Sequence, residues 1–180
     1  MRIQKIISYF IIALFCYSCQ NENIYQNVGT IPSSGWAMDQ SIYFQDSIPS
    51  SAPENIGYEI YIRHSNIYPY QNVWLYIQTK SSDGQTRSDS INWKLSEANG
   101  RWLGKGWGSL YNISYRLPNL VIKKSAQKRW FRIDIEHGLR DKVLVGIEDI
   151  GIRLFTIRDS LTSDSTSLLP VSIKTQEDKK

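Results

Sequence analysis

The sequence predicts an all-β protein built as an antiparallel β-sandwich, immunoglobulin-like or jelly-roll-like, with an open β-barrel as the alternative. Three observations lead to this fold class. Apolar and polar residues alternate with a period of two over several short segments, and turns containing Gly, Pro or Asn separate these segments. In addition, no stretch of helical length shows a period of 3.6 residues.

The clearest alternation places apolar side chains on one face of each predicted strand and more polar side chains on the other. Ile60 and Ile62, for example, alternate with Glu59 and Arg63. The four clearest strands are expected at residues 58–63, 73–78, 91–96 and 131–136. Further strands are expected at Ser41–Ile48, Tyr111–Leu117, Leu120–Lys123 and Gly151–Ile157. The turn signals are Ser82-Asp83-Gly84, Asn99-Gly100 and Leu117-Pro118-Asn119, and residues 138–145 are compatible with one short turn of helix.

Length and composition favour one folded domain. The chain has 180 residues, of which 41% are hydrophobic and 21% charged, and its formal net charge is +4. These values exclude a wholly disordered chain, a collagen-like fibre and a multi-pass membrane protein. We expect a lipoprotein signal peptide over residues 1–18, a lipidated N-terminus and flexible linker over 19–35, a single β-sandwich domain over 36–158, and a disordered polar tail over 159–180.

The N-terminus has the features of a bacterial lipoprotein signal. Arg2 and Lys5 precede the uncharged run Ile6–Phe15, which is too short to cross a bilayer as a helix but suits a secretory signal. Small Ser18 then precedes Cys19, whose thiolate is the nucleophile that receives diacylglycerol before cleavage and acylation with a chain such as palmitate. We therefore predict lipid attachment at Cys19, with ordinary secretion and cleavage nearby as the alternative.

The position of the acidic residues after Cys19 bears on where the lipoprotein resides. Acidic residues directly after the cysteine direct some bacterial lipoproteins to the cell surface, and here only Glu22 is acidic. We therefore expect an outer-membrane lipoprotein that faces the periplasm.

No group of residues in the sequence is typical of catalysis. The only histidines are His64 and His137, both cysteines fall within the signal region, and there is no tight cluster of carboxylates. Neither a phosphate-binding P-loop nor a Gly-x-Ser-x-Gly nucleophile elbow occurs. We expect no enzyme activity, no metal, no cofactor and no small-molecule ligand.

A cationic stretch without acids lies between residues 123 and 132. It consists of Lys123, Lys124, Lys128, Arg129 and Arg132. We interpret it as protection of an edge strand against aggregation, with contact to anionic lipid or an acidic partner as the alternative. Nucleic acid is not an expected partner, because an exported lipoprotein rarely meets it.

The segment WLGKGW differs from the other aromatic segments, whose aromatics mostly alternate along strands. Trp102 and Trp107 frame Gly104 and Gly106, a spacing that lets the backbone approach closely or bulge beside large rings. A structural role is favoured. The alternative is a sugar-stacking face made by Trp102, Trp107 or Tyr70, which would make the protein a carbohydrate-binding envelope lipoprotein.

Four Asp-Ser pairs are each followed by an apolar residue or Thr. Such triplets look like a short O-glycosylation signal used on exported bacterial proteins. The serines expected to carry a glycan on this basis are Ser47, Ser90, Ser160 and Ser165.

Several segments together resemble the gliding-motility lipoprotein GldH family. The matching segments are Tyr58–Arg63 (YEIYIR), Tyr68–Leu75 (YPYQNVWL), Gly100–Gly108 (GRWLGKGWG) and Asp134–Arg153 (DIEHGLRDKVLVGIEDIGIR). They follow the family's order across most of the predicted domain. The motif residues to which the resemblance gives no role are Trp102, Gly104, Gly106, Arg140, Asp149 and Gly151. The resemblance implies a membrane-anchored, non-enzymatic accessory of the gliding apparatus, linked to type IX secretion, that acts through contacts with other envelope proteins.

Overall fold

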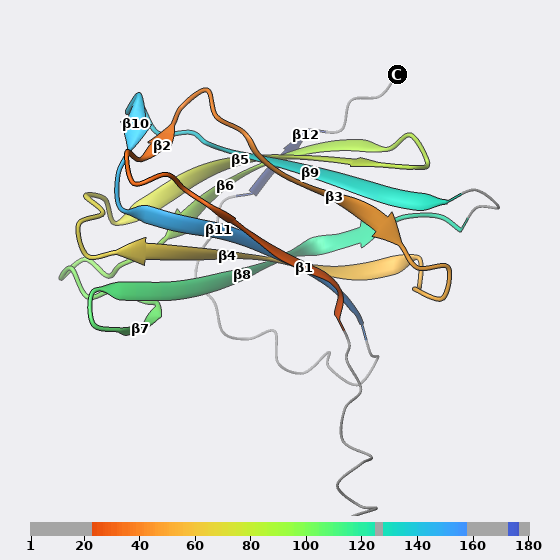
Figure 1. Ribbon diagram of the computed structural model, residues 1–180, viewed down its shortest axis with the longest axis horizontal. Coiled ribbons are helices and arrows are strands. Elements are labelled where there is room, and N and C mark those ends of the chain that lie inside the picture. Colours follow the sequence, from red (N-terminus) through yellow and green to blue (C-terminus); the bar gives the residue numbers. More distant parts are fainter. Residues whose placement is uncertain (1–22, 125–127, 158–172, 177–180) are drawn as a thin grey trace, which may run out of the picture.

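A computed structural model describes residues 23–124, 128–157 and 173–176 as a two-layered β-sandwich (Figure 1). The strands are β1 (Asn23–Thr30), β2 (Trp36–Ala37), β3 (Ile42–Ile48), β4 (Asn55–Ser65), β5 (Asn72–Ser81), β6 (Thr86–Lys94), β7 (Lys105–Trp107), β8 (Leu110–Val121), β9 (Arg129–His137), β10 (Val143–Leu144), β11 (Ile147–Thr156) and β12 (Ile173–Gln176). The first sheet has the order β1-β11-β4-β8-β7, and the second has the order β12-β6-β5-β9-β3. A short ribbon of β10 and β2 lies at one end. The predicted all-β sandwich is confirmed.

The alternation that predicted the strands places one face of each sheet in a shared core. In β4 the side chains of Tyr58, Ile60 and Ile62 point inward and are almost completely buried, and in β9 Ile133 and Ile135 do the same. Burying an isoleucine completely contributes about 1.5–3 kcal/mol relative to leaving it exposed. The core therefore holds the two sheets together without any covalent cross-link among the described residues.

Two sequence predictions about strand boundaries were wrong. The turn expected at Leu117-Pro118-Asn119 lies inside the single strand β8, where the register against β4 shifts between Ile56 and Tyr58. Proline is tolerated there because this part of β8 has a hydrogen-bonded neighbour on one side only. The turn of helix considered for residues 138–145 is absent, because Val143 and Leu144 instead pair with β2.

The start of the folded domain also differs from the expected boundary at residue 36. Asn23–Thr30, which the sequence placed in a flexible linker, pairs with β11 over its whole length as an edge strand of the first sheet. The ring of Tyr25 packs edge-on against Phe131 with centroids 5.0 Å apart. An edge strand that buries few side chains shows little alternation, which is why the segment resembled a linker. At the other end of the chain, Ile173–Gln176 pairs with β6 rather than belonging wholly to a disordered tail.

Arg129 and Arg132, the residues of the cationic stretch that lie in β9, do not protect an edge strand, because β9 has hydrogen-bonded neighbours on both sides, β5 and β3. The guanidinium of Arg129 is buried and donates hydrogen bonds of 2.7–2.8 Å to the carbonyl oxygens of Ala52, Pro53 and Ile122. These bonds tie the loop after β3 and the end of β8 to β9. No helix of the described residues is long and apolar enough to cross a membrane.

Candidate functional site

Exposed apolar side chains gather at one end of the sandwich, on the left in Figure 1. The β10–β2 ribbon, the β4–β5 connection and the β7–β8 hairpin meet at this end. We call this surface the apolar end and define it by the exposed residues Met38, Ile67, Tyr70, Trp107, Leu110, Val143 and Val145. Exposed apolar side chains that gather at one end of a soluble domain indicate an interaction site.

Backbone hydrogen bonds join the three segments of the apolar end. The amide of Ser65 donates to the carbonyl of Gly146 at 2.8 Å, and the amide of Asn66 donates to that of Ser109 at 2.9 Å. The amide of Met38 donates to the carbonyl of Lys142 at 2.9 Å. The surface is therefore held by bonds between segments far apart in the sequence.

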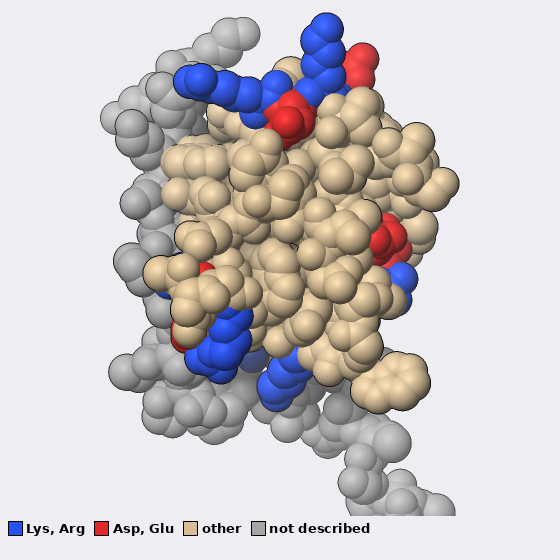
Figure 2. Space-filling view, turned by 90° about the vertical axis from the view of Figure 1, so that its left-hand side faces the viewer, with Lys and Arg blue, Asp and Glu red and all other residues tan. Residues whose placement is uncertain are grey.

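The apolar end is almost free of charge at its centre. Figure 2 views the molecule from this side, and its Lys, Arg, Asp and Glu side chains lie around the margin of a broad surface of uncharged residues. Trp107 is 94% exposed at the end of β7, so its ring contributes almost nothing to the core. A tryptophan left in water at the tip of a hairpin suits contact with a partner better than stabilisation of the fold.

A cluster of four rings, two buried and two half-buried, supports the apolar end from beneath. The imidazole of His64 lies 4.5 Å from the ring of Trp102 and stacks on Tyr111 at 5.6 Å, and Tyr68 closes the cluster at 6.0 Å from His64. The Nδ1 atom of His64 donates to the carbonyl oxygen of Ser65 at 3.2 Å. Burial lowers the pKa of His64 and this hydrogen bond partly offsets the shift. The histidine is therefore a neutral packing element at physiological pH.

His137 plays a similar part beneath the β10–β2 ribbon. Its Nε2 atom donates to the carbonyl oxygen of Trp36 at 3.0 Å, and its ring packs edge-on against the Trp36 indole at 5.2 Å. The indole N–H of Trp36 in turn donates to the carbonyl of Gln40 at 2.8 Å. Burial lowers the pKa of His137, against smaller opposing effects of the Trp36 hydrogen bond and the Asp141 charge.

The two glycines between Trp102 and Trp107 lie against the backbone of β8. A Cβ atom on Gly104 would come within 2.7 Å of the carbonyl oxygen of Asn112, and one on Gly106 would collide with the backbone of Leu110. These positions therefore accept only glycine without displacement of β7. Trp102 is half-buried and packs against His64, while Trp107 projects into solvent.

The motif residues Asp149 and Gly151 lie on the outer face of the first sheet, away from the core. Asp149 forms an ion pair with Arg63 of the neighbouring strand β4, and Gly151 lies opposite Tyr61, whose ring fills the space that a side chain on residue 151 would need. A third cross-strand pair joins Glu59 and Arg153. The motifs YEIYIR and GIEDIGIR are thus adjacent strands that pair with one another, and their outward residues have a structural role.

The remaining predicted site residues are dispersed. Arg140 is exposed in the connection between β9 and β10. The hydroxyl of Tyr70 donates to Oδ2 of Asp141 at 2.6 Å. Tyr70 and Trp107 are exposed, whereas Trp102 is half-buried. A sugar-stacking face that uses any of these three rings stays a prediction.

Two of the serines in the Asp-Ser triplets can be located. Ser47 lies in β3 and Ser90 in β6, both partly buried within paired strands. Cys19, Ser160 and Ser165 lie outside the described residues. Lipid attachment and O-glycosylation at these positions remain predictions.

Reactive groups are not brought together in the described part of the chain. Within residues 23–124, 128–157 and 173–176, no three His, Cys, Asp or Glu side chains gather so that they could hold a metal ion. The sequence did not single out Met38, Ile67, Val143 of β10 or Val145 just after it, which make up much of the apolar end. In the sequence, each of them is only an apolar residue within or beside a predicted turn. That pattern is too common to predict an exposed surface.

The fold and its most distinctive surface define a class of protein, a small β-sandwich domain with an exposed apolar end. A sequence model of the family described as GldH lipoprotein matches residues 23–154. The chain belongs to the GldH lipoprotein family, which confirms the resemblance found in its motifs. The match begins at the first residue of β1, in agreement with the boundary of the folded domain.

Two relatives cover nearly the same extent. The chain is 28% identical over 154 residues to the gliding motility lipoprotein GldH homolog of Christiangramia forsetii, covering 81% of this chain and 90% of the relative. It is 21% identical over 164 residues to the gliding motility lipoprotein GldH of Flavobacterium johnsoniae, covering 86% of this chain and 98% of the relative.

Similarity to solved structures is low. A fructofuranosidase from Schwanniomyces occidentalis matches with a TM-score of 0.39 and 9% identity, over 76% of this chain and 34% of the enzyme. The infectious bursal disease virus VP2 subviral particle matches with a TM-score of 0.31 and 17% identity, over 86% of this chain and 35% of the viral protein. The chain therefore spans about a third of each of these proteins.

Proposed function

We propose that this protein is a non-catalytic lipoprotein, anchored through Cys19 in the outer membrane and facing the periplasm, that serves the gliding apparatus and the type IX secretion linked to it. It acts by docking another envelope protein at the apolar end. The observation that carries this proposal is the exposed apolar surface at the end where three segments of the domain meet, with Trp107 94% exposed. Family membership supports the role in gliding, and the predicted lipid attachment supports the anchor.

The position of β1 favours a protein over the membrane as the occupant of the apolar end. Thr30, at the end of β1, pairs with Asp149 close to the apolar end, whereas Asn23 pairs with Phe155 at the other end of the strand. A strand of this length spans about 27 Å. The four-residue step from Cys19 to Asn23 reaches at most ~14 Å. A lipid on Cys19 therefore holds the Asn23 end near the membrane, and the apolar end is the part of the domain that extends away from it.

The proposal is tested by photo-crosslinking in the source bacterium. A photoreactive residue replaces Trp107 in one strain and Val121 in another, because both side chains are exposed and apolar and they flank opposite ends of β8. We expect crosslinks from position 107 to an envelope protein of the gliding or secretion machinery, and none to that protein from position 121. Equal crosslinking from both positions would argue against a docking site at the apolar end.

A functional test places negative charges on the apolar end and measures gliding and secretion. The double variant Ile67→Asp/Trp107→Asp is expected to abolish gliding or secretion of type IX cargo at normal protein levels, while Val121→Asp leaves both intact. A deletion strain that glides and secretes normally would refute the assignment to gliding. A Cys19→Ala variant that stayed in the membrane fraction after a salt wash would refute the lipid anchor.

A further inference from the structure

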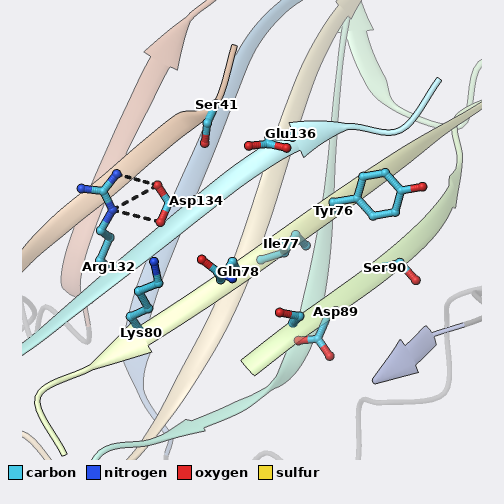
Figure 3. Close-up of a pocket in the computed structure, with 11 residues that line it drawn as sticks. Ser41, Tyr76, Ile77, Gln78, Lys80, Asp89, Ser90, Arg132, Asp134 and Glu136 are labelled. Carbon is cyan, nitrogen blue, oxygen red and sulfur yellow. Dashed lines mark hydrogen bonds and ion pairs between the residues drawn. The ribbon is translucent and has the colours of Figure 1, made fainter. Parts of the chain in front are cut away.

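A second surface, on the outer face of the second sheet, has the features of a ligand site. A hollow of about 650 Å³ lies over the middle strands β9, β5 and β6 (Figure 3). It is distinct from the apolar end, and the proposed docking function does not use it. Its volume falls within the range of small-molecule sites, about 300–1,000 Å³.

Hydrogen-bond donors and hydrogen-bond acceptors line this hollow in a regular array. Across the strands, Glu136 lies opposite Tyr76, and Asp134 lies opposite Gln78. Lys80 lies opposite Arg132 in the next row. Neighbouring strands are about 4.8 Å apart and successive outward residues about 6.8 Å apart. The surface therefore presents fixed hydrogen-bond donors and acceptors at separations comparable with those between hydroxyl groups on one sugar ring or two linked rings.

One ion pair in the lining is held in place before any ligand arrives. The guanidinium of Arg132 donates to both carboxylate oxygens of Asp134 at 2.7–3.0 Å and lies over the ring of Tyr43, 4.5 Å from its centroid. The ring of Tyr76 lies against Gly138, where a Cβ atom would come within 2.7 Å of Cε2, yet Tyr76 is 53% exposed. The Arg132–Asp134 pair therefore loses little conformational entropy on binding, and the exposed part of the Tyr76 ring is open to a ligand.

The chemistry of the lining narrows the class of ligand. An anion bound at Lys80 and Arg132 would be repelled by the nearby carboxylates of Asp134 and Glu136. A cation bound at those carboxylates would be repelled by the lysine and the arginine, so neither kind of ion fits the surface well. A peptide strand has no unpaired backbone to join, because β5 and β9 are hydrogen-bonded on both sides. A neutral sugar fits both parts of the surface, since its C–H face packs on an aromatic ring and its hydroxyl groups both donate and accept hydrogen bonds.

We propose that the outer face of the second sheet binds a neutral oligosaccharide, with Tyr76 as the stacking ring and Gln78, Glu136 and the Arg132–Asp134 pair as its hydrogen-bonding partners. This site differs from the aromatic face considered from the sequence, because none of Trp102, Trp107 and Tyr70 takes part. A lipoprotein with both surfaces would hold a protein at its end and a glycan on its side.

The test uses the full-length lipoprotein, extracted from membranes in a detergent without a sugar headgroup. Maltohexaose, cellohexaose, chitohexaose and mannohexaose are titrated by isothermal calorimetry, with inorganic phosphate as a separate anion probe. We expect at least one oligosaccharide to bind. Tyr76→Ala should weaken that binding roughly tenfold or more, the loss expected when a stacking ring is removed. Tyr70→Ala, which removes an exposed ring at the apolar end, should change it by less than about twofold.

Several outcomes would overturn this proposal. These are the absence of binding by all four oligosaccharides, binding of phosphate alone, or an equal loss in Tyr76→Ala and Tyr70→Ala. Gln78→Ala provides a second variant should Tyr76→Ala fail to fold, as judged by its melting temperature, and we expect a loss of several-fold. Failure here leaves the docking proposal standing, because crosslinking at position 107 does not depend on Tyr76.

Discussion

The outer faces of the two sheets both carry arginine–carboxylate pairs, but the pairs have different roles on the two faces. On the first sheet, two arginines pair with carboxylates of another strand, as in Arg63–Asp149 between β4 and β11. On the second sheet, Arg132 pairs with Asp134, two residues along the same strand. A cross-strand pair brings together groups that are distant in the unfolded chain, whereas a same-strand pair joins groups that are already close along the chain before folding. The first face is thus organised to hold strands together, and the second positions groups without adding much stability.

The largest expected difference between the faces concerns a glycine on the first sheet. A side chain on Gly151 would come within 2.8 Å of Tyr61 and 3.1 Å of Val28. Gly151→Val should therefore lower the free energy of unfolding by about 2–3 kcal/mol through overpacking. Urea denaturation followed by circular dichroism measures this change. A loss below about 0.5 kcal/mol would mean that the first face is as adaptable as the second.

The next difference separates the two arginines. The carboxylate of Asp149 is 8% exposed and that of Asp134 is 15% exposed, so removing either arginine leaves a partly buried charge. Arg63→Ala should cost about 1–2 kcal/mol, reduced from the value for fully buried pairs because Arg63 itself is 47% exposed. Arg132→Ala should cost under about 1 kcal/mol. Equal losses for the two variants would contradict the distinction between cross-strand and same-strand pairs.

Between pH 7.5 and 5.5, we expect acid to lower the stability of the fold through the two histidines beneath the apolar end rather than through either outer face. The pKa values of His64 and His137 are lowered by burial in the folded protein, so the unfolded chain takes up protons first. The contribution of each histidine to the free energy of unfolding is fully present above the ordinary histidine pKa. As the pH drops through that pKa, this contribution falls by at most about 1.4 kcal/mol per pH unit for each histidine. Urea midpoints at pH 7.5 and 5.5 measure this slope. His64→Phe should flatten it, and an unchanged slope would exclude His64 as a source.

The smallest effect on stability is expected at Gly138 on the second sheet. Its neighbour is the exposed ring of Tyr76, which can swing away from an added methyl group. Gly138→Ala should change the free energy of unfolding by less than about 0.5 kcal/mol. The same substitution should weaken oligosaccharide binding, because it displaces the ring. A large loss of stability would show that Tyr76 contributes to the fold rather than to a ligand site.

Local patterns in the sequence predicted the strands that bury one face, and little else. The alternation of apolar and polar residues in β4, β5 and β9 involves only residues close together in the sequence. The predicted bounds of these strands are therefore close to the observed ones. The strand β1 escaped notice because it packs few side chains into the core, and Pro118 suggested a turn because nothing local shows that its strand lacks an outer neighbour.

The candidate surfaces were less predictable still, because they depend on register between distant strands. The apolar end joins residues near positions 38, 67, 107 and 143, and the hollow joins outward residues of β5 with those of β9. Outward polar residues look alike on every strand, so no single segment distinguishes Glu136 from other solvated carboxylates. The motif residues Asp149 and Gly151, to which the family resemblance gave no role, pack against neighbouring strands of the first sheet.

The placement of β1 has a mechanical consequence. In a chain tethered just ahead of Asn23 and gripped at the apolar end, tension runs along β1, parallel to the strand and perpendicular to its hydrogen bonds with β11. All of these bonds then resist the load together in shear, rather than opening one after another like a zipper. The domain could therefore transmit a sustained pull between a membrane and a moving partner without unravelling from its anchored strand.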